Sequence, residues 1–541
     1  MTKSLGSILL AIQFLLLSCT SESVKKDRYD YSSMNRATRK AYQRVDQFLQ
    51  RGIQYQDPVE LVKHSRIDSI VIKKKPRKLD IYLNGWFSAM PLREQNTAMI
   101  YAGVKTALGR KFRKYPITIF ADGHPIEQLI PNLYRDSLSD YDRARMPAKS
   151  APPSPLVRRT SHPWQISHGL NNRHIALWPS HGWYYEQKLD RWEWQRARVF
   201  QTVEDLMPMA FTHHYLVPML ENAGAQVFLP RERDVQTHEV VIDNDSQGNK
   251  KFYEEYSSEK SLAWQTTDAP GFAVGRLPYT SGVNPFQSGT SRKIETSGEA
   301  KAGVRWIPDI PVSDEYAVYI SFFSSEQNVT DAHYTVFHSG GQTEFLVNQQ
   351  MGGGTWIYLG TFKFEAGINA EIGKVELNNL SQDPGKLVTA DAVRFGGGMG
   401  NIARNGKVSG RPRFTEAARY YLQYTGMPDS LVYNLNKDKK DYNDDYQSRG
   451  EWVNYLKGAP FGPNRDRSVA GLGVPIDLSL GFHTDAGRTR NDTVIGTLSI
   501  YSTEDPDDSI FFPDSMSRLA NRDFADILQT QLVNDIRKKY D

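Results

Sequence analysis

Residues 174–183 read HIALWPSHGW, and they indicate the architecture of the chain. HIALW is a short, mostly apolar run of the kind that forms a buried strand, and His181 follows just past its end. A second such run, IDLSLGF at residues 476–482, is followed directly by His483. Ligands of an open parallel sheet gather at the carboxyl ends of its strands. We therefore expect both runs in one sheet, with both histidines at the same edge of it.

The predicted secondary structure between and after these two runs changes twice, from α/β to all-β and back to α/β. Helical periodicity extends over about residues 192–222, and the predicted strand AQVFL follows Gly224, a typical helix stop. From about residue 264 to 395 the pattern is one of short alternating strands with Gly-rich turns, which favours an all-β sandwich. An α/β pattern then returns as a helix, a strand and a final amphipathic helix, expected at residues 414–424, 494–502 and 516–539.

The simplest organisation is one α/β domain interrupted by the sandwich, because neither α/β piece alone has enough strands to bury a sheet. We predict that residues 170–262 and 401–541 form this domain and that residues 263–400 are the inserted sandwich. A small α/β domain is expected at residues 36–146, followed by a Pro- and Ser-rich linker at residues 147–169. The predicted fold class is therefore α/β, a sheet with flanking helices split by an all-β insertion.

The beginning of the chain has the pattern of an export signal. An apolar run of signal-peptide length follows Lys3 and ends in LLSC, which resembles the lipobox of bacterial lipoproteins. Cys19 is the only cysteine, so an internal disulfide is impossible, and we predict that Cys19 carries a lipid anchor to a membrane. Residues 1–19 are then a signal peptide and residues 20–35 a polar tether. Thr20 in place of an aspartate favours the outer membrane of a cell envelope; the alternative is an ordinary secretory signal with a chance cysteine.

The overall composition is that of a globular protein. Of the 541 residues, 39% are hydrophobic and 24% are charged, and a chain of this length fits roughly three or four domains. The formal net charge is only +4 and the basic residues are scattered, which argues against a nucleic-acid partner. No run after the first apolar one is long enough for a transmembrane helix.

Three segments contain side chains that can bind a metal ion. His181 and His483 follow the two strands, and Glu204 lies beside the apolar stripe of the helix expected at residues 192–222. Two histidines and one carboxylate form a recurrent catalytic zinc set that leaves a fourth position for water. Zinc lowers the pKa of that water to near neutrality and polarises a carbonyl, as amide hydrolysis requires. The alternative is that the histidines cap strands and the glutamate lies on a solvated face. Two rival ligands lie on the same helix, His213 and His214.

These segments also resemble a known family. IALWPSHGW, TVEDL, LVPMLENAGAQVFLPRERD and IDLSLGFHTDAG together resemble the zinc-dependent N-acetylmuramoyl-L-alanine amidases. The resemblance implies that His181, Glu204 and His483 hold zinc and that the substrate is the amide between the lactyl group and the first L-alanine of peptidoglycan. Asp485, two residues after His483, is predicted to support a ligand by hydrogen bonding.

The predicted sandwich carries a second resemblance. VRWIPDIPVSDEYAVYISF, GGGTWIYLGTFKF and VTADAVRFGG resemble the golvesin C-terminal domain and the carbohydrate-binding-like part of xanthan lyase. That resemblance implies a glycan partner for the sandwich. Nothing in the sequence supports eliminative lyase chemistry.

The sequence departs from the amidase pattern at two points. The first histidine stands in PSHG where the family has PGHGG. The family also has a catalytic glutamate on a strand after the last long helix, whereas this chain stops at Asp541 and no residue matches that glutamate; Glu504 would be a remote substitute. The catalytic residue is therefore unknown. Two functions follow: a zinc amidase-like enzyme acting on peptidoglycan, or a non-catalytic surface lipoprotein that binds glycan or peptidoglycan through its sandwich.

Overall fold

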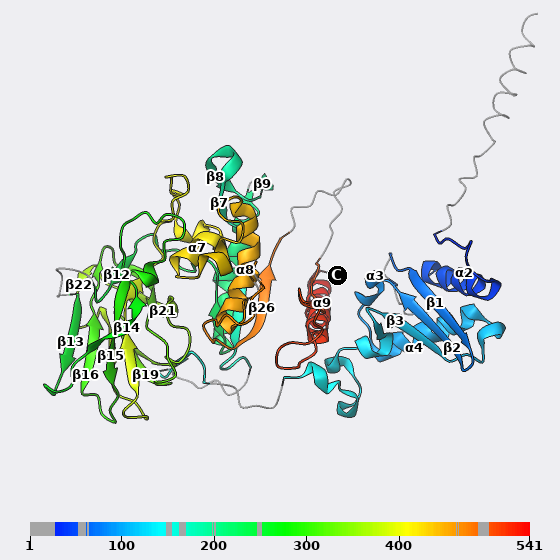
Figure 1. Cartoon of the computed structure of the whole chain (residues 1–541), viewed down its shortest axis with the longest axis horizontal. Helices are drawn as coiled ribbons and strands as arrows, with labels where there is room; N and C mark the ends of the chain where they lie inside the picture. The colour runs from blue at the N-terminus through cyan, green and yellow to red at the C-terminus, as the bar shows by residue number, and fades with distance from the viewer. Residues whose placement is uncertain are drawn as a thin grey trace, which may run out of the picture. The chain divides into compact units, whose positions relative to one another are not determined.

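The computed structural model describes most of the chain after residue 27. The described residues are 28–51, 61, 64–147, 154–161, 169–196, 198–199, 202–245, 252–460, 462–463, 465–484 and 497–540. The predicted lipidation site Cys19 and the predicted supporting residue Asp485 lie outside them. The chain divides into a first unit, Met1–Ser150 with Thr489–Asp541, and a second unit, Ala151–Arg488 (Figure 1). Within the described ranges no helix is long and apolar enough to cross a bilayer.

The first unit contains a four-stranded mixed sheet in the order β1-β2-β3-β4. Strands β2 and β3 are parallel, which requires a crossover connection, and helix α4 provides it. Helix α2 is confirmed at the predicted residues 36–51, and its apolar face packs against β1 and α4. The bounds are α2 Arg36–Arg51, β1 Ile67–Lys74, β2 Arg77–Leu83, α3 Gly85–Ser88, α4 Glu94–Leu108, β3 Ile117–Ala121, β4 His124–Pro125 and α9 Leu519–Tyr540.

The last helix, α9, belongs to this first unit. Arg522 is 2% exposed and donates hydrogen bonds to the backbone oxygens of Ser88 and Met90, both at 3.0 Å. Leu519 completes the same apolar core. The predicted grouping of residues 401–541 is therefore wrong beyond Arg488, because an amphipathic pattern shows that a helix must be buried but not which sheet covers it. The described part of the strand predicted at residues 494–502 is also not a strand.

The second unit contains a three-stranded parallel sheet in the order β11-β6-β26. Strand β6 is central and nearly all of its residues are buried, as expected for a strand covered on both faces. Strand β26 pairs with β6 in parallel, so the prediction that these distant segments share one sheet is confirmed. Helix α8 packs against β26 and α7 (Figure 1). The bounds are β6 His174–Pro179, β11 Gln226–Phe228, α7 Ala418–Tyr424, α8 Asp441–Lys457 and β26 Ile476–Phe482.

The helix predicted at residues 192–222 is wrong over nearly its first half. The chain there forms strands, and the helix begins only at Leu206. Pro218 has no N–H to donate to the carbonyl four residues back, and a π-helical turn precedes it. The bounds are β7 Trp183–Glu186, β8 Arg191–Trp194, β9 Arg198–Val199, β10 Thr202–Val203, α5 Leu206–Phe211, the π-turn Thr212–Leu216 and α6 Val217–Asn222.

The remainder of the second unit is the predicted β-sandwich, but its boundaries are wider than expected. Sheets of order β13-β16-β23-β19-β20-β5, β12-β25-β18-β21 and β14-β15-β24 enclose one apolar core. Strands β12 and β13 precede residue 263, the predicted start of the sandwich. Strand β5 lies in the segment expected to be a linker, and it pairs with β20 at the edge of a sandwich sheet. The bounds are β5 Val157–Arg159, β12 Val240–Ile242, β13 Tyr253–Ser257, β14 Gln265–Gly271, β15 Gly289–Glu295, β16 Ala302–Trp306, β17 Asp309–Ile310, β18 Asp314–Ile320, β19 Ala332–His338, β20 Gly341–Val347, β21 Ile357–Phe364, β22 Gly367–Ile368, β23 Lys374–Asn378, β24 Leu387–Ala390 and β25 Val393–Phe395.

Buried carboxyl groups make the stability of this unit depend on pH. Burial raises the pKa of Asp391 to about 7, and burial together with the charge of Asp391 raises the pKa of Asp243 to about 8. Because both pKa values lie above the unfolded value near 4, the folded state retains these protons longer, and stability falls as the pH rises through this range. Each group contributes this loss of stability between its unfolded pKa near 4 and its folded pKa.

We expect the free energy of unfolding of the second unit to decrease between about pH 7 and pH 8, above the ordinary histidine pKa near 6.5, where most histidines are neutral in both states. Chemical denaturation followed by tryptophan fluorescence measures this directly. Asp391→Asn removes one titrating group and is expected to reduce the slope. An equal slope in wild type and Asp391→Asn would contradict the assignment to Asp391.

Candidate functional site

The three predicted ligands meet at the carboxyl edge of the parallel sheet. His181 follows β6 and His483 follows β26, and the centroids of the two imidazole rings are 5.0 Å apart. His181 Nδ1 lies 4.0 Å from Glu204 Oε1. Side chains from three separate parts of the chain therefore converge at one place, as the two strand-end motifs indicated.

The turn that carries His181 is fixed from several directions. Ser180 has a positive φ of 51° and its Oγ lies 2.7 Å from His181 Nδ1. A Cβ on Gly182 would lie 2.7 Å from the backbone nitrogen of Ala417, so only glycine allows this close approach. Arg231, which is 1% exposed, donates to the carbonyls of Pro179 at 2.9 Å and of His181. These contacts hold the histidine before any ligand arrives.

Glu204 does not lie on a helix, contrary to the prediction. It follows strand β10 and precedes α5, and its carbonyl accepts a hydrogen bond of 3.0 Å from the backbone N–H of Met207. Glu204 is 4% exposed. Its neighbour Asp205 is fully buried, and Asp205 Oδ1 lies 3.8 Å from His181 Nδ1. Burial raises the pKa of Asp205 to about 7.

The site is surrounded by arginines. Arg196 Nη2 lies 3.1 Å from His181 Nε2, and Arg196 Nε lies 3.7 Å from Glu204 Oε2. Arg449 is held by an ion pair with Asp445. Burial first, then Arg449 and Arg196, lowers the pKa of His181 to about 3. The same causes lower the pKa of His483 to about 4. Both imidazoles are therefore neutral at physiological pH.

The donor chemistry of the three ligands fits zinc. Neutral imidazole and carboxylate are the forms that bind this metal, and both histidines are neutral here. Donor atoms bound to one zinc at about 2.0–2.2 Å lie closer together than the 4.0 Å between His181 and Glu204. Accordingly, the part of the chain that the structure describes contains no ready group of three His, Cys, Asp or Glu ligands. The zinc site thus remains a prediction that requires a small contraction.

The other sequence candidates lie elsewhere. The rival ligands His213 and His214 are on the π-turn and form no hydrogen bond or ion pair with the three ligands in the described chain. Glu504 is exposed and belongs to the first unit. Sequence reasoning missed Arg196, Asp205, Arg231 and Arg449. Asp205 and Arg231 had a signal, since Asp205 adjoins a predicted ligand and Arg231 lies in the segment LVPMLENAGAQVFLPRERD. Arg196 and Arg449 reach the site from segments without a recognisable motif.

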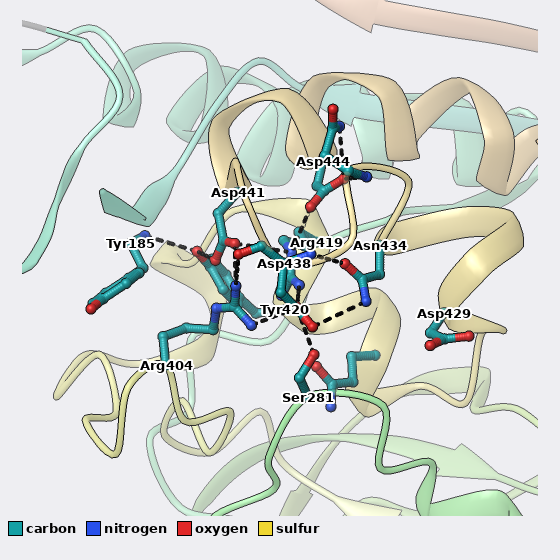
Figure 2. Close-up of polar contacts among 12 residues, drawn as sticks. Tyr185, Ser281, Arg404, Arg419, Tyr420, Asp429, Asn434, Asp438, Asp441 and Asp444 are labelled. Atoms are coloured by element: carbon teal, nitrogen blue, oxygen red, sulfur yellow. Dashed lines mark hydrogen bonds and ion pairs between the residues drawn. The ribbon is translucent and has the colours of Figure 1, made fainter. Parts of the chain in front are cut away.

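A network of arginines and aspartates, buried except for the half-buried Asp438, supports the hairpin β7–β8 (Figure 2). Arg404 Nη2 donates to Asp441 Oδ1 at 2.6 Å, and Tyr420 Oη donates to Asp441 Oδ2 at 2.8 Å. Tyr420 Oη in turn accepts a 2.8 Å hydrogen bond from the backbone N–H of Tyr185 in β7. Arg419 Nη2 donates to Asp438 Oδ1 at 2.7 Å. Through Tyr420, the network joins helices α7 and α8 to the hairpin. Its arginines and aspartates are paired with one another, so we assign the network a structural role.

Comparison with known proteins identifies a relationship for the sandwich. Residues 268–397 match the sequence model of the Golvesin C-terminal domain. Over 102 residues the chain is 31% identical to the xanthan lyase of Bacillus sp. (strain GL1), a match that covers 19% of this chain and 11% of that protein. The chain therefore spans only about a tenth of the length of this relative. The golvesin resemblance seen in the sequence is confirmed, and the amidase resemblance stays a prediction.

Two solved structures also match part of the chain, at low similarity. Paenibacillus xanthan lyase matches with 24% identity and a TM-score of 0.23, over 30% of this chain and 13% of that one. The C-terminal family 6 carbohydrate-binding module of LamC from Zobellia galactanivorans matches with 15% identity and a TM-score of 0.18, over 29% of this chain and 99% of the module. By the sequence-model match of residues 268–397, the second unit contains a golvesin C-terminal-like sandwich, and the same unit contains the parallel sheet that carries the two histidines.

Proposed function

We propose that this protein binds glycan through its β-sandwich. The observation that carries the proposal is the match of residues 268–397 to the Golvesin C-terminal domain, together with 31% identity to a segment of a xanthan lyase. The name of that relative gives a polysaccharide as the compound on which it acts. The location in a cell envelope stays a prediction that rests on the residues around Cys19, so envelope glycan and peptidoglycan are the partners of first choice.

Affinity electrophoresis of the full chain tests this proposal. Migration is expected to slow in native gels that contain xanthan, or the protein is expected to co-sediment with insoluble peptidoglycan sacculi. Bovine serum albumin provides the non-binding control. Binding by the sandwich should be unaffected by EDTA, because no predicted metal ligand lies in the sandwich. Unchanged migration in xanthan together with no sedimentation with sacculi would overturn the proposal.

A second function is favoured by one specific observation, the convergence of His181, Glu204 and His483 at the strand ends. We propose that these residues hold zinc in an amidase-like hydrolytic centre that acts on peptidoglycan. When bound, zinc would acidify a water molecule and polarise the amide carbonyl. The chain itself keeps both imidazoles neutral through burial and positions His181 through Arg231. Arg196 lies 3.1 Å from His181 Nε2 and 3.7 Å from Glu204 Oε2, so its positive charge competes with a cation for these two side chains.

A further inference from the structure

The sandwich contains a groove that neither resemblance assigns. Its volume is about 590 Å³, within the range typical of ligand pockets. It lies where strand β14, strand β24 and the loop between β18 and β19 meet. The side chains that line it include Thr267, Asp268, Lys293, Phe323, Glu326 and Asn328.

Strand β14 forms one wall of this groove. Its pairing with β15 is interrupted between Thr266 and Pro270, so the residues between them are released from the ladder. Such bulges redirect side chains and are common beside binding sites. Thr267 Oγ1 lies 2.6 Å from Ser291 Oγ, and this contact fixes the released segment. Asp268, next to it, is exposed and has no ion pair within the described chain.

The opposite wall is a rigid loop. Asn328 is fully buried, and its Nδ2 donates to the carbonyl of Phe323 at 2.6 Å. Thr389 Oγ1 donates to the same carbonyl at 2.7 Å. The backbone N–H of Leu387 donates to the carbonyl of Gln327 at 3.1 Å. The loop is therefore ordered before binding, which limits the entropy lost when a ligand is held.

The groups that this loop and bulge present are suited to a sugar. The Phe323 ring is 36% exposed and offers a flat face on which a pyranose can stack. Asp268, Glu326 and Lys293 have no ion pairs among the described residues, so their hydrogen-bonding groups are available for hydroxyls. The mixture of signs disfavours nucleic acid, and a single exposed ring among polar groups disfavours an apolar peptide or lipid.

We propose that this groove is the glycan-binding site of the sandwich and that it holds a short saccharide segment stacked on Phe323. This inference rests on the proposed glycan-binding function and specifies where binding takes place. Asp268 and Glu326 accept hydrogen bonds from sugar hydroxyls, and Lys293 donates one, with a preference for an acidic sugar at its end of the groove.

Affinity electrophoresis of the full chain in xanthan, with sacculi as a second probe, tests the site. Phe323→Ala is expected to weaken binding about tenfold through loss of the stacking face. Phe211→Ala is the matched control, because this ring is 53% exposed on helix α5, outside the sandwich. Asp268→Asn and Glu326→Gln change only exposed groups, so these two variants test the site even if Phe323→Ala disturbs the fold. Each is expected to weaken binding several-fold.

The outcomes separate the site from the function. Weaker binding by the groove variants, with unchanged binding by Phe211→Ala, supports the groove. Binding by Phe323→Ala, Asp268→Asn and Glu326→Gln at wild-type strength would overturn the groove and leave the glycan-binding function intact. Failure of the wild type to bind either probe would overturn the function and the groove together.

Discussion

Replacing His181 with alanine is expected to remove specific zinc binding from the full chain. The wild type should retain about one zinc ion per chain after dialysis, because two neutral imidazoles and a buried carboxylate converge at the strand ends. Without the His181 imidazole the remaining pair of ligands is too few for a stable site, and retained zinc should fall below about a tenth of the wild-type amount. Elemental analysis of the dialysed protein measures this, and competition with a chromophoric chelator gives the affinity.

His214→Ala is the matched control, since His214 is exposed on the π-turn and contacts none of the three ligands. Arg196→Ala tests whether the Arg196 guanidinium competes with zinc for His181 and Glu204. Its guanidinium lies 3.1 Å from His181 Nε2 and is 40% exposed, so its removal should strengthen zinc binding. Equal zinc content in wild type, His181→Ala and His483→Ala would show that the histidines only cap their strands.

The sheet that carries this site could be predicted because its strands are short apolar runs bounded by polar turns. Residues 174–178 are buried on both faces, and such continuous runs are typical of central parallel strands. The placement of both histidines at one edge followed from that topology. Their partner Glu204 was identified correctly as a neighbour of His181 but was assigned to the wrong element.

The errors arose where contacts over long distances determine local structure. The segment before Glu204 has helix-compatible spacing, but β7 and β8 pair there as a hairpin that Tyr420 supports through the backbone of Tyr185. Helix α9 is amphipathic in any setting, and long-range contacts such as the hydrogen bonds from Arg522 to Ser88 and Met90 identify its partner. Neither contact has a local signature in the sequence.

A large loss of stability is expected when the ion pair between Glu232 and Arg394 is broken. Both side chains are fully buried, with Glu232 Oε2 2.5 Å from Arg394 Nη1. Tyr319 Oη also donates to Glu232, and the Arg394 guanidinium lies 3.8 Å from the centroid of the Tyr319 ring. Glu232 follows Arg231 directly, so adjacent residues support the His181 turn and the sandwich strand β25. The pair therefore links the candidate site to the sandwich.

Glu232→Ala should lower the free energy of unfolding of the second unit by about 3–5 kcal/mol, because it removes the fully buried carboxylate and leaves the Arg394 charge with only the more distant Glu239, 3.7 Å away. Arg394→Met should have a similar effect, and the double variant should lose less than the sum of the two, as expected for residues in direct contact. Urea denaturation followed by tryptophan fluorescence gives the three values. Glu259→Ala removes a surface pair with Lys301, whose side chain is 35% exposed, and should leave the stability nearly unchanged. Additive losses in the double variant would mean that Glu232 and Arg394 stabilise the unit independently, and the link between site and sandwich would then have to lie in the backbone contacts of Arg231.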